Sequence, residues 1–168
     1  MIILGIDPGT ATIGYGVIRA QLQKGKKQKI KCLAYGLIET KPDQSFPNRL
    51  KKISREYNGL INKYKPDLIA MESVFFFRNL KTFIPVSRAC GVLILESAKK
   101  NIPIIEFTPL QVKLKVADYG RAEKKDLQKK VEKILNLGKI PKPDDIADAL
   151  AVAICAVFAK GNGQGSKN

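Results

Sequence analysis

The sequence predicts an α/β domain in which helices cover a single sheet of mixed strand direction. Three strand-like segments come first, and helix-like and strand-like segments then alternate, an order that favours one mixed sheet over segregated layers. The chain has 168 residues, of which 45% are hydrophobic and 27% charged, close to the averages for soluble globular proteins. We therefore expect a single domain over residues 1–160, followed by a flexible tail over residues 161–168.

The first three strands are predicted by runs of apolar and β-branched residues. Residues 2–6 form a continuous apolar run that stops at the tripeptide Asp7-Pro8-Gly9, where proline and glycine favour a turn. Residues 13–20 and 30–39 are predicted as two further strands, joined by a hairpin with a basic, glycine-containing tip at residues 24–27. These strands should form an antiparallel meander, which places Asp7 at the end of the first strand.

Helical and strand-like patterns alternate in the middle of the chain. Residues 47–64 repeat apolar side chains at helical spacing, which predicts an amphipathic helix packed on the sheet. Residues 67–72 form a short apolar strand that ends in a glutamate, and residues 103–107 form a fifth strand. Between them, residues 80–100 are predicted as an apolar helix that is bent or begun anew at Pro85.

Three helices are predicted after the fifth strand. The pair Thr108-Pro109 supplies an N-cap and a proline at the first helical position, so a short helix should run from there toward Val116. Residues 123–135 form another amphipathic segment. A last, largely apolar helix is predicted over residues 143–157, with Asp144 as a simple cap at its beginning.

The charge of the chain indicates the kind of partner it binds. Thirty Lys and Arg residues against fifteen Asp and Glu residues leave a formal charge of +15, as expected for a protein that binds the phosphate backbone of a nucleic acid. The alternative is that lysine serves only as the preferred solubilising residue. Charge alone therefore favours nucleic acid as the partner but names no reaction.

The cysteines and the hydropathy pattern point to the cytoplasm. The chain has three widely separated cysteines, which supports neither a disulfide framework nor a zinc site and favours small buried residues in a reducing compartment: Cys32, Cys90 and Cys155. The sequence has no charged segment ahead of its first apolar run and no apolar stretch of the length that spans a membrane. We expect a cytoplasmic protein without a membrane partner.

Acidic residues stand at three places that a folded sheet could bring together. Asp7 ends the first strand, and Glu72 ends the fourth. Asp145 and Asp148 lie near the start of the last helix, where a spacing of three puts both side chains on one face and the helix dipole partly offsets their charge. Four carboxylates gathered in this way would repel one another without cations.

The chemistry of these acids favours a magnesium or manganese site. The chain contains no histidine, and a set of oxygen ligands suits Mg²⁺ or Mn²⁺ better than zinc or copper. Without histidine as a general base, hydrolysis would depend on water activated by metal, with two ions roughly 3.5–4 Å apart. Phosphodiester hydrolysis fits both the acids and the basic charge.

Each acid also has a purely structural interpretation. Asp7 could begin the turn that follows it, Glu72 could be a solvated strand end, and Asp145 could serve only the helix N-terminus. Two settings argue against this interpretation. Glu72 lies between apolar segments, where an unpaired carboxylate is costly, and Asp148 is flanked by apolar residues on a largely apolar helix.

Several motifs together resemble one known family over nearly the whole chain, up to about Ala156. Read in order, they are similar to those of the RuvC Holliday-junction resolvases: residues 5–10 (GIDPGT), 14–18 (GYGVI), 72–75 (ESVF) with Asn79, 88–91 (RACG), 111–113 (QVK), 122–124 (AEK) and 145–150 (DIADAL). The chain departs from the family pattern at Ser73, at Asp118 and in the lysine-rich hairpin over residues 21–29, which bears on sequence preference and affinity rather than on the reaction.

The resemblance implies a ribonuclease H-like fold, a homodimer and a structure-selective endonuclease of DNA recombination and repair. Such an enzyme nicks two strands of a four-way junction symmetrically and leaves 5′-phosphate and 3′-hydroxyl ends. The resemblance also implies two Mg²⁺ ions per active site, with Mn²⁺ as a substitute, and the branch-migration proteins RuvA and RuvB as partners. The implied metal ligands are the acids identified above: Asp7, Glu72, Asp145 and Asp148.

Further site residues follow from the same resemblance. Lys124 matches a lysine associated with catalysis and DNA contact, and Lys113 a second DNA-contacting lysine, although each could be a solvated surface charge. Phe75 matches an aromatic residue that engages bases near the crossover, although it could instead be a core residue. The neighbouring Arg78 and Lys81 are further candidates for DNA contact. Residues 84–97 match the helix that carries the dimer contact.

Three other functions remain open at this stage. The segment Asp7-Pro8-Gly9-Thr10 also resembles the phosphate loop of actin-like ATPases and sugar kinases, but those proteins need two such domains around the nucleotide. A compact RuvC-like nuclease that trims ribosomal RNA precursors shares the fold and the acids but is typically shorter. A catalytically silent junction-binding protein would use the basic surface alone.

Overall fold

Five strands form one sheet at the centre of the molecule. The computed structural model describes residues 1–21, 28–73, 80–117 and 119–161, with only the backbone of residues 80–82. The strands lie in the order β3-β2-β1-β4-β5; β1 pairs with β2 and β2 with β3 in antiparallel fashion, whereas β4 is parallel to both β1 and β5. This confirms the predicted mixed sheet with three antiparallel strands first. The strand bounds are β1 (Ile2–Asp7), β2 (Thr12–Gln21), β3 (Lys29–Glu39), β4 (Leu68–Glu72) and β5 (Ile104–Phe107).

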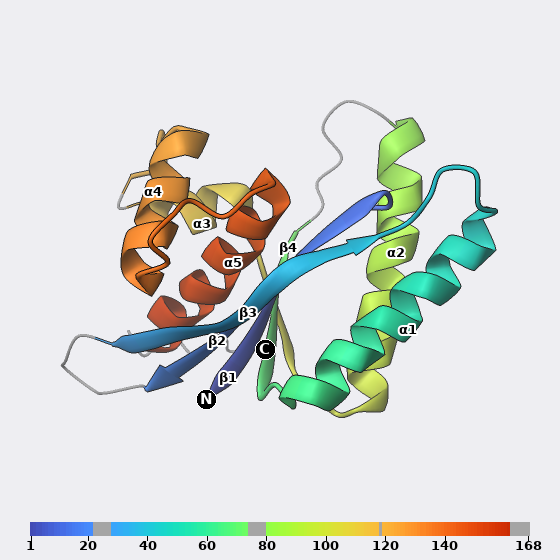
Figure 1. Cartoon of the computed structure of the whole chain (residues 1–168), viewed down its shortest axis with the longest axis horizontal. Helices are drawn as coiled ribbons and strands as arrows, with labels where there is room; N and C mark the ends of the chain where they lie inside the picture. The colour runs from blue at the N-terminus through green and yellow to red at the C-terminus, as the bar shows by residue number, and fades with distance from the viewer. Residues whose placement is uncertain (22–27, 74–79, 118, 162–168) are drawn as a thin grey trace.

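Helices cover both faces of this sheet (Figure 1). One face carries α1 (Phe46–Tyr64) and α2 (Leu80–Lys99). The other carries α3 (Pro109–Val116), α4 (Lys124–Leu135) and α5 (Asp144–Gly161), of which α5 packs directly against β1 and β2. The described helices and strands follow the order and approximate bounds predicted from the sequence.

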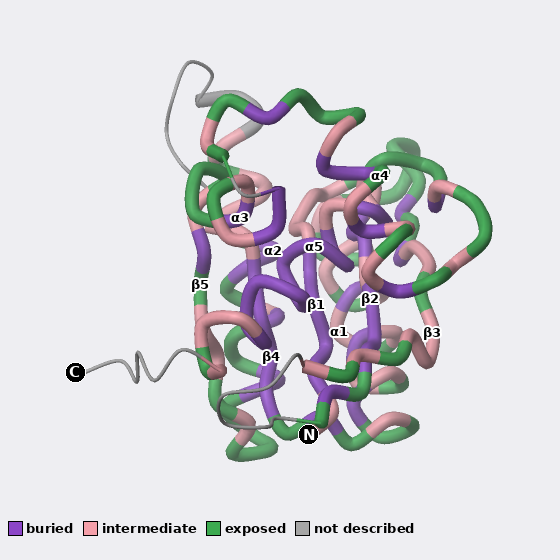
Figure 2. Tube along the Cα trace, turned by 90° about the vertical axis from the view of Figure 1, so that its left-hand side faces the viewer, coloured by how far each residue is buried: buried purple, intermediate pink, exposed green. Residues whose placement is uncertain are grey.

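Strand β1 is buried on both of its faces (Figure 2). Successive side chains of a strand point to opposite faces, so Ile3 joins the core beneath α5, whereas Leu4 joins the core beneath α1 and α2. Burial on both sides explains why residues 2–6 are a continuous apolar run instead of an alternating one.

Helix α2 decides against one of the two alternatives predicted at Pro85. The helix is not begun anew there, because one continuous helix extends from Leu80 to Lys99 with Pro85 inside it. A proline lacks the N–H that would bond to the carbonyl four residues earlier, but here that carbonyl belongs to the first turn. The helix therefore loses one bond close to its beginning and continues.

Some remaining predictions concern the ends of the chain and the cysteines. α5 includes Gly161, so the predicted tail does not start at residue 161, and residues 162–168 lie outside the described residues, as does the hairpin tip over 24–27. All three cysteines are free; Cys90 and Cys155 are buried as predicted, whereas Cys32 is only partly buried. None of the helices in the described part of the chain is long and apolar enough to cross a membrane.

Candidate active site

Two of the predicted acids lie side by side at one edge of the sheet. Asp7 is the last residue of β1, and Glu72 is the last residue of β4. The two strands are parallel neighbours, and Ile6 pairs with Met71 immediately before the two acids. The carboxyl ends of parallel strands meet at the same edge, so the register of this one strand pair brings Asp7 and Glu72 together.

Glycines allow α5 to bring the other two acids to this edge. A Cβ atom on Gly14 would overlap with the backbone carbonyl of Asp145, and one on Gly5 would overlap with the carbonyl of Ala149. Gly14 is also the cross-strand partner of Asp7. The start of α5 therefore lies directly on the sheet beside Asp7, at a distance that only a residue without a side chain permits.

The carboxylates are close enough to act on one another electrostatically. Burial, and after it the negative charges of the other three acids, raises the pKa of Asp7 from its ordinary 3.8 to about 8. Burial and the charge of Asp148 raise the pKa of Glu72 to about 7, against an opposing effect of Lys124. Burial also raises the pKa of Asp148. Ionising this cluster is therefore unfavourable unless positive charge is added.

The raised pKa of Asp7 predicts that its ionisation destabilises the metal-free protein. The carboxyl group binds its proton more tightly in the folded state, so stability present below about pH 4 is lost as pH rises through about 8. Asp7→Asn cannot ionise, so we expect its melting temperature in EDTA to exceed that of the wild type by several degrees at alkaline pH. The difference should shrink toward zero at about pH 4.

Paired melting curves of wild type and Asp7→Asn across this pH range test the prediction. All other titrating groups are shared by the two proteins, so the difference isolates Asp7 together with its electrostatic effect on its neighbours. A difference that is constant with pH, or that grows toward acid pH, would contradict the proposed burial of Asp7 among other acids.

Lys124 and Thr12 make direct contacts with the acids of α5. The Nζ atom of Lys124 lies 3.1 Å from Oδ2 of Asp148, with the lysine side chain 52% exposed. Thr12 Oγ1 donates a hydrogen bond of 3.2 Å to Oδ2 of Asp145. Lys124 thus places a positive charge beside Asp148, and Thr12 orients the carboxylate of Asp145.

The structure corrects the prediction that Asp144 is a simple cap. Asp144 is the first residue of α5, and its carboxylate accepts a hydrogen bond of 2.9 Å from Gln128 Nε2 and pairs with Lys124 Nζ at 3.3 Å. Helix α4 packs beside the start of α5, so side chains from α4 donate to both carboxylate oxygens of Asp144. Asp144 therefore links Lys124 and Gln128 of α4 to the first residue of α5 instead of capping α5.

The donor set fits a hard divalent cation. Asp7, Glu72 and Asp148 are partly buried carboxylates with raised pKa values, and the chain has no histidine that would favour a softer metal. Within the described residues, no three acidic or cysteine side chains already stand at the mutual distances of a formed metal site. Binding a cation would thus require the carboxylates to move closer together.

The other sequence-predicted site residues are less well placed or lie outside the description. Lys113 is in the last turn of α3, partly buried, and has no ion pair with an acid among the described residues. Phe75 and Arg78 lie outside the described residues, as does the side chain of Lys81 at the start of α2. The structure therefore brings the four acids and Lys124 together, whereas a role for Lys113 stays a prediction.

Sequence reasoning missed the supporting residues of the site. Thr12 and Gln128 were not singled out, because a threonine near a turn and a glutamine on a polar helix face carry no signal of their own. Gly5 and Gly14 lie within the quoted motifs. Their positions on two predicted adjacent strands were the one available signal that a helix approaches the sheet closely there.

Comparisons with known proteins agree on one family. Residues 3–156 match the family model described as "Crossover junction endodeoxyribonuclease RuvC". Proteins of that name from Syntrophomonas wolfei and Alkaliphilus oremlandii are 50% and 51% identical over 155 residues, covering 92% of this chain and 87% and 92% of the relatives.

Solved structures give the same result. The structure of Thermus thermophilus RuvC superposes with a TM-score of 0.89 at 29% identity, covering 97% of each chain. The T. thermophilus RuvC in complex with a Holliday junction substrate superposes with a TM-score of 0.87 at 27% identity, again covering 97% of each chain.

Proposed function

Because this chain belongs to the RuvC family of crossover junction endodeoxyribonucleases, we propose that it resolves Holliday junctions by paired, symmetric nicks made with two metal ions per active site. The family relationship supports a metal-dependent nuclease that hydrolyses phosphodiester bonds of junction DNA. The observation that carries the proposed mechanism is the meeting of Asp7, Glu72, Asp145 and Asp148 at one edge of the sheet, with raised pKa values for three of them.

We assign these four carboxylates as the metal ligands. Divalent metal supplies a water nucleophile at neutral pH and stabilises the attacking and leaving oxygens. Asp7 would hold metal together with the other three acids, because the charges of all three raise its pKa. Thr12 holds Asp145 by a hydrogen bond, which limits the rotations that Asp145 can make.

Lys124 is assigned to the scissile phosphate. Its ammonium group lies 3.1 Å from Asp148 at the entrance of the site, and half of its side chain is exposed to solvent. A phosphate placed against the acids would be repelled by them, and an adjacent ammonium group offsets this repulsion and the charge that develops during hydrolysis. Asp144 and Asp148 together keep Lys124 at that position.

The proposed ions are two Mg²⁺ per active site, with Mn²⁺ as a substitute. Ligands that are all carboxylate oxygens suit both of these hard cations, and the chain offers no histidine to select zinc. Four acids are more than one ion needs, since Mg²⁺ usually keeps several waters, and this favours two ions.

A homodimer is proposed to position two such sites on one junction. Helix α2 buries Ala89 and Leu93 against the sheet but leaves Ile84, Ile94 and Leu95 at 44%, 42% and 53% exposed, an apolar surface that a second copy could cover. A two-fold dimer matches the two-fold symmetry of the junction and would place one nick on each of two strands. A protein that sediments as a monomer while bound to a junction would contradict this arrangement.

The remaining parts of the proposal extend the same function. We propose that the chain up to the end of α5 at Gly161 forms one nuclease domain that works in the cytoplasm, with RuvA and RuvB as partners. DNA contacts are assigned to Lys113 and Lys124 and to three residues between β4 and the first turn of α2: Phe75, Arg78 and Lys81.

Cleavage of a labelled synthetic four-way junction tests the proposed function. Duplex DNA and an RNA–DNA hybrid are the control substrates, each with Mg²⁺, with Mn²⁺ and with EDTA. The proposal expects paired nicks of like polarity, confined to the junction, ligatable, and absent with EDTA. Junction binding without nicks in any metal, or preferential cutting of the hybrid, would overturn it.

A further inference from the structure

Helix α4 carries a straight row of unpaired lysines. Lys125, Lys129 and Lys133 follow one another at intervals of four residues, so they share one face of the helix, and all three are exposed. None of them forms an ion pair among the described residues. Like charges at this spacing repel by about 0.2–0.5 kcal/mol per pair, so the row costs stability by itself. We call these three residues the lysine row.

Helices α1 and α2, on the opposite face of the sheet, each contain a lysine that is paired with an acid of the same helix. There, Lys52 pairs with Glu56 within α1 at 3.5 Å, and Lys99 pairs with Glu96 within α2 at 3.2 Å. The row has no such arrangement, because Asp126 of α4 is already engaged by the Tyr119 hydroxyl and the backbone of Glu123. The lysine row therefore lacks the ion pairs that Lys52 and Lys99 have with acids of their own helices.

The row also borders a cavity. Lys129, Lys130 and Lys133 line a cavity of about 280 Å³ together with Ala117, Tyr119 and Asp126. Among the described residues that line it, the acidic side chain Asp126 is already hydrogen-bonded, and three lysines stand beside it. A concave surface with this charge suits an anionic group better than a flat, solvated helix face would.

The row begins at the active site and leads away from it. Lys124, the residue before the row, pairs with Asp148 of the site. Each step of four residues along a helix advances about 6 Å, so the row extends roughly 12 Å from there. One strand of duplex DNA carries a phosphate about every 3.4 Å along its axis, so each step of the row spans about two phosphates.

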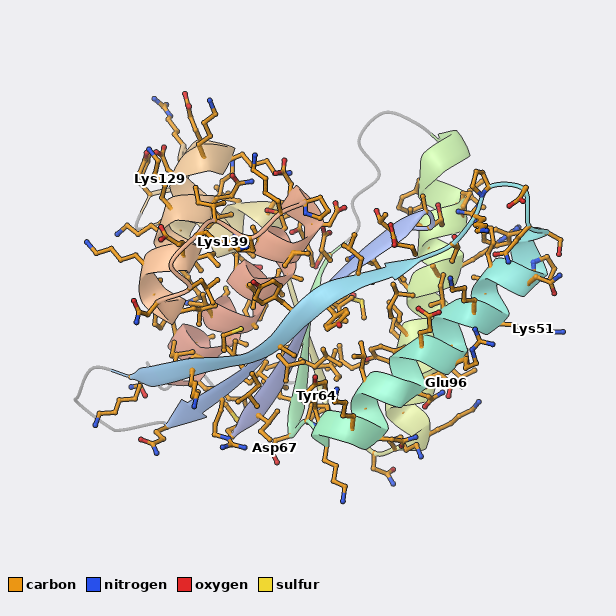
Figure 3. All side chains as sticks on the ribbon, viewed as in Figure 1. Lys51, Tyr64, Asp67, Glu96, Lys129 and Lys139 are labelled. Carbon is orange, nitrogen blue, oxygen red and sulfur yellow. The ribbon has the colours of Figure 1, made fainter. Side chains whose placement is uncertain are left out.

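The geometry points to a second DNA-binding surface: the lysine row of α4 binds the phosphate backbone of a junction arm as the arm leaves the active site. This inference rests on the proposed function and deepens it, because it assigns a path to the substrate beyond the cleaved bond. The row faces the side of the molecule opposite to α1, as the positions of Lys129 and Lys51 show (Figure 3).

A matched pair of triple variants tests this path. Lys125→Gln/Lys129→Gln/Lys133→Gln removes the row, and glutamine preserves helix propensity at exposed positions. The control removes the same charge from exposed lysines of α1 and the end of α2: Lys51→Gln, Lys63→Gln and Lys100→Gln. Hydroxyl-radical footprinting without added Mg²⁺ would use junctions whose arms are about two helical turns, roughly 20 base pairs, long.

Wild type and control should protect both the crossover and a stretch of arm backbone, whereas the row variant should protect the crossover alone. In anisotropy titrations, we plot the logarithm of the binding constant against the logarithm of the salt concentration. The slope for the row variant should be less steep than that of wild type by about 3, one for each lost phosphate contact. Between about 50 and 200 mM salt, wild-type affinity would then fall roughly 40-fold further than that of the variant.

Two results would overturn the inference. An equal loss of arm protection and affinity in both triple variants would mean that only total charge matters. An unchanged arm footprint in the row variant would mean that the lysine row does not contact the arm and instead binds another partner, such as an acidic protein surface. Failure of the proposed function is distinguishable, because it would appear as wild type that does not protect the crossover or that binds the junction without nicking it in any metal, whereas failure of the inference changes only the comparison of arm footprints and salt dependence between the two triple variants.

Discussion

Asp7→Asn should reduce the rate of junction cleavage by roughly a thousandfold or more, while the protein stays folded. The charges of the other three acids all raise the pKa of Asp7. An asparagine keeps the shape of the side chain but removes the negative charge that would hold metal, so the loss should arise from metal binding. Single-turnover nicking with saturating enzyme measures the effect, and calorimetric titration with Mn²⁺ measures the accompanying loss of metal affinity.

Asp43→Asn is the matched control for this experiment. Asp43 is exposed in the loop before α1, and the same substitution there removes one charge from a residue outside the acidic cluster. It should leave both the nicking rate and the metal affinity within about twofold of wild type. A variant at Asp7 that nicks at near wild-type rate would show that the cluster is not the metal site, whatever its pKa values.

Gly14→Ala should destabilise the protein by more than about 3 kcal/mol, a large part of the stability of a typical domain. The added methyl group would overlap with the backbone of Asp145, which cannot move without shifting the whole of α5 away from the sheet. Urea denaturation measures this loss. The fraction that still folds should also nick poorly, because the shift would move Asp145 and Asp148 away from Asp7.

Gly59→Ala is expected to change stability in the opposite direction and serves as the control for Gly14→Ala. Gly59 lies in the interior of α1, is exposed, and has nothing within 4 Å of an added methyl group. Alanine there should stabilise the protein by about 1 kcal/mol, because glycine is a poor helix former. Equal stability of Gly14→Ala and wild type would contradict the close packing of α5 on β2.

The sequence predicted the elements well because their patterns are local. The continuous apolar run before Asp7 indicated a strand buried on both faces, and the helical spacing over residues 47–64 indicated a helix with one buried face; the structure has both. Of the two alternatives predicted at Pro85, a bend or a new helix, the new helix was wrong, since a proline near a helix start removes only one early hydrogen bond and neighbouring packing decides whether the helix continues.

The candidate site could be predicted in part. Acids at strand ends and at a helix start are visible in one dimension, and the topology brings those four together. The partners of Lys124 were not predictable, because its pairing with Asp144 and Asp148 depends on how α4 lies beside α5. The hydrogen bond from Thr12 to Asp145 spans 133 residues of chain and has no local signal.

The sequence by itself therefore determined the order of strands and helices, the basic charge and the identity of the candidate ligands, because these depend on residue type and short-range periodicity. The tertiary structure alone decided the strand register that sets Asp7 beside Glu72, and how closely the glycines let α5 approach. It also decided that the lysine row starts at the active site. These features depend on contacts between distant segments, and only the packing of the whole chain fixes such contacts.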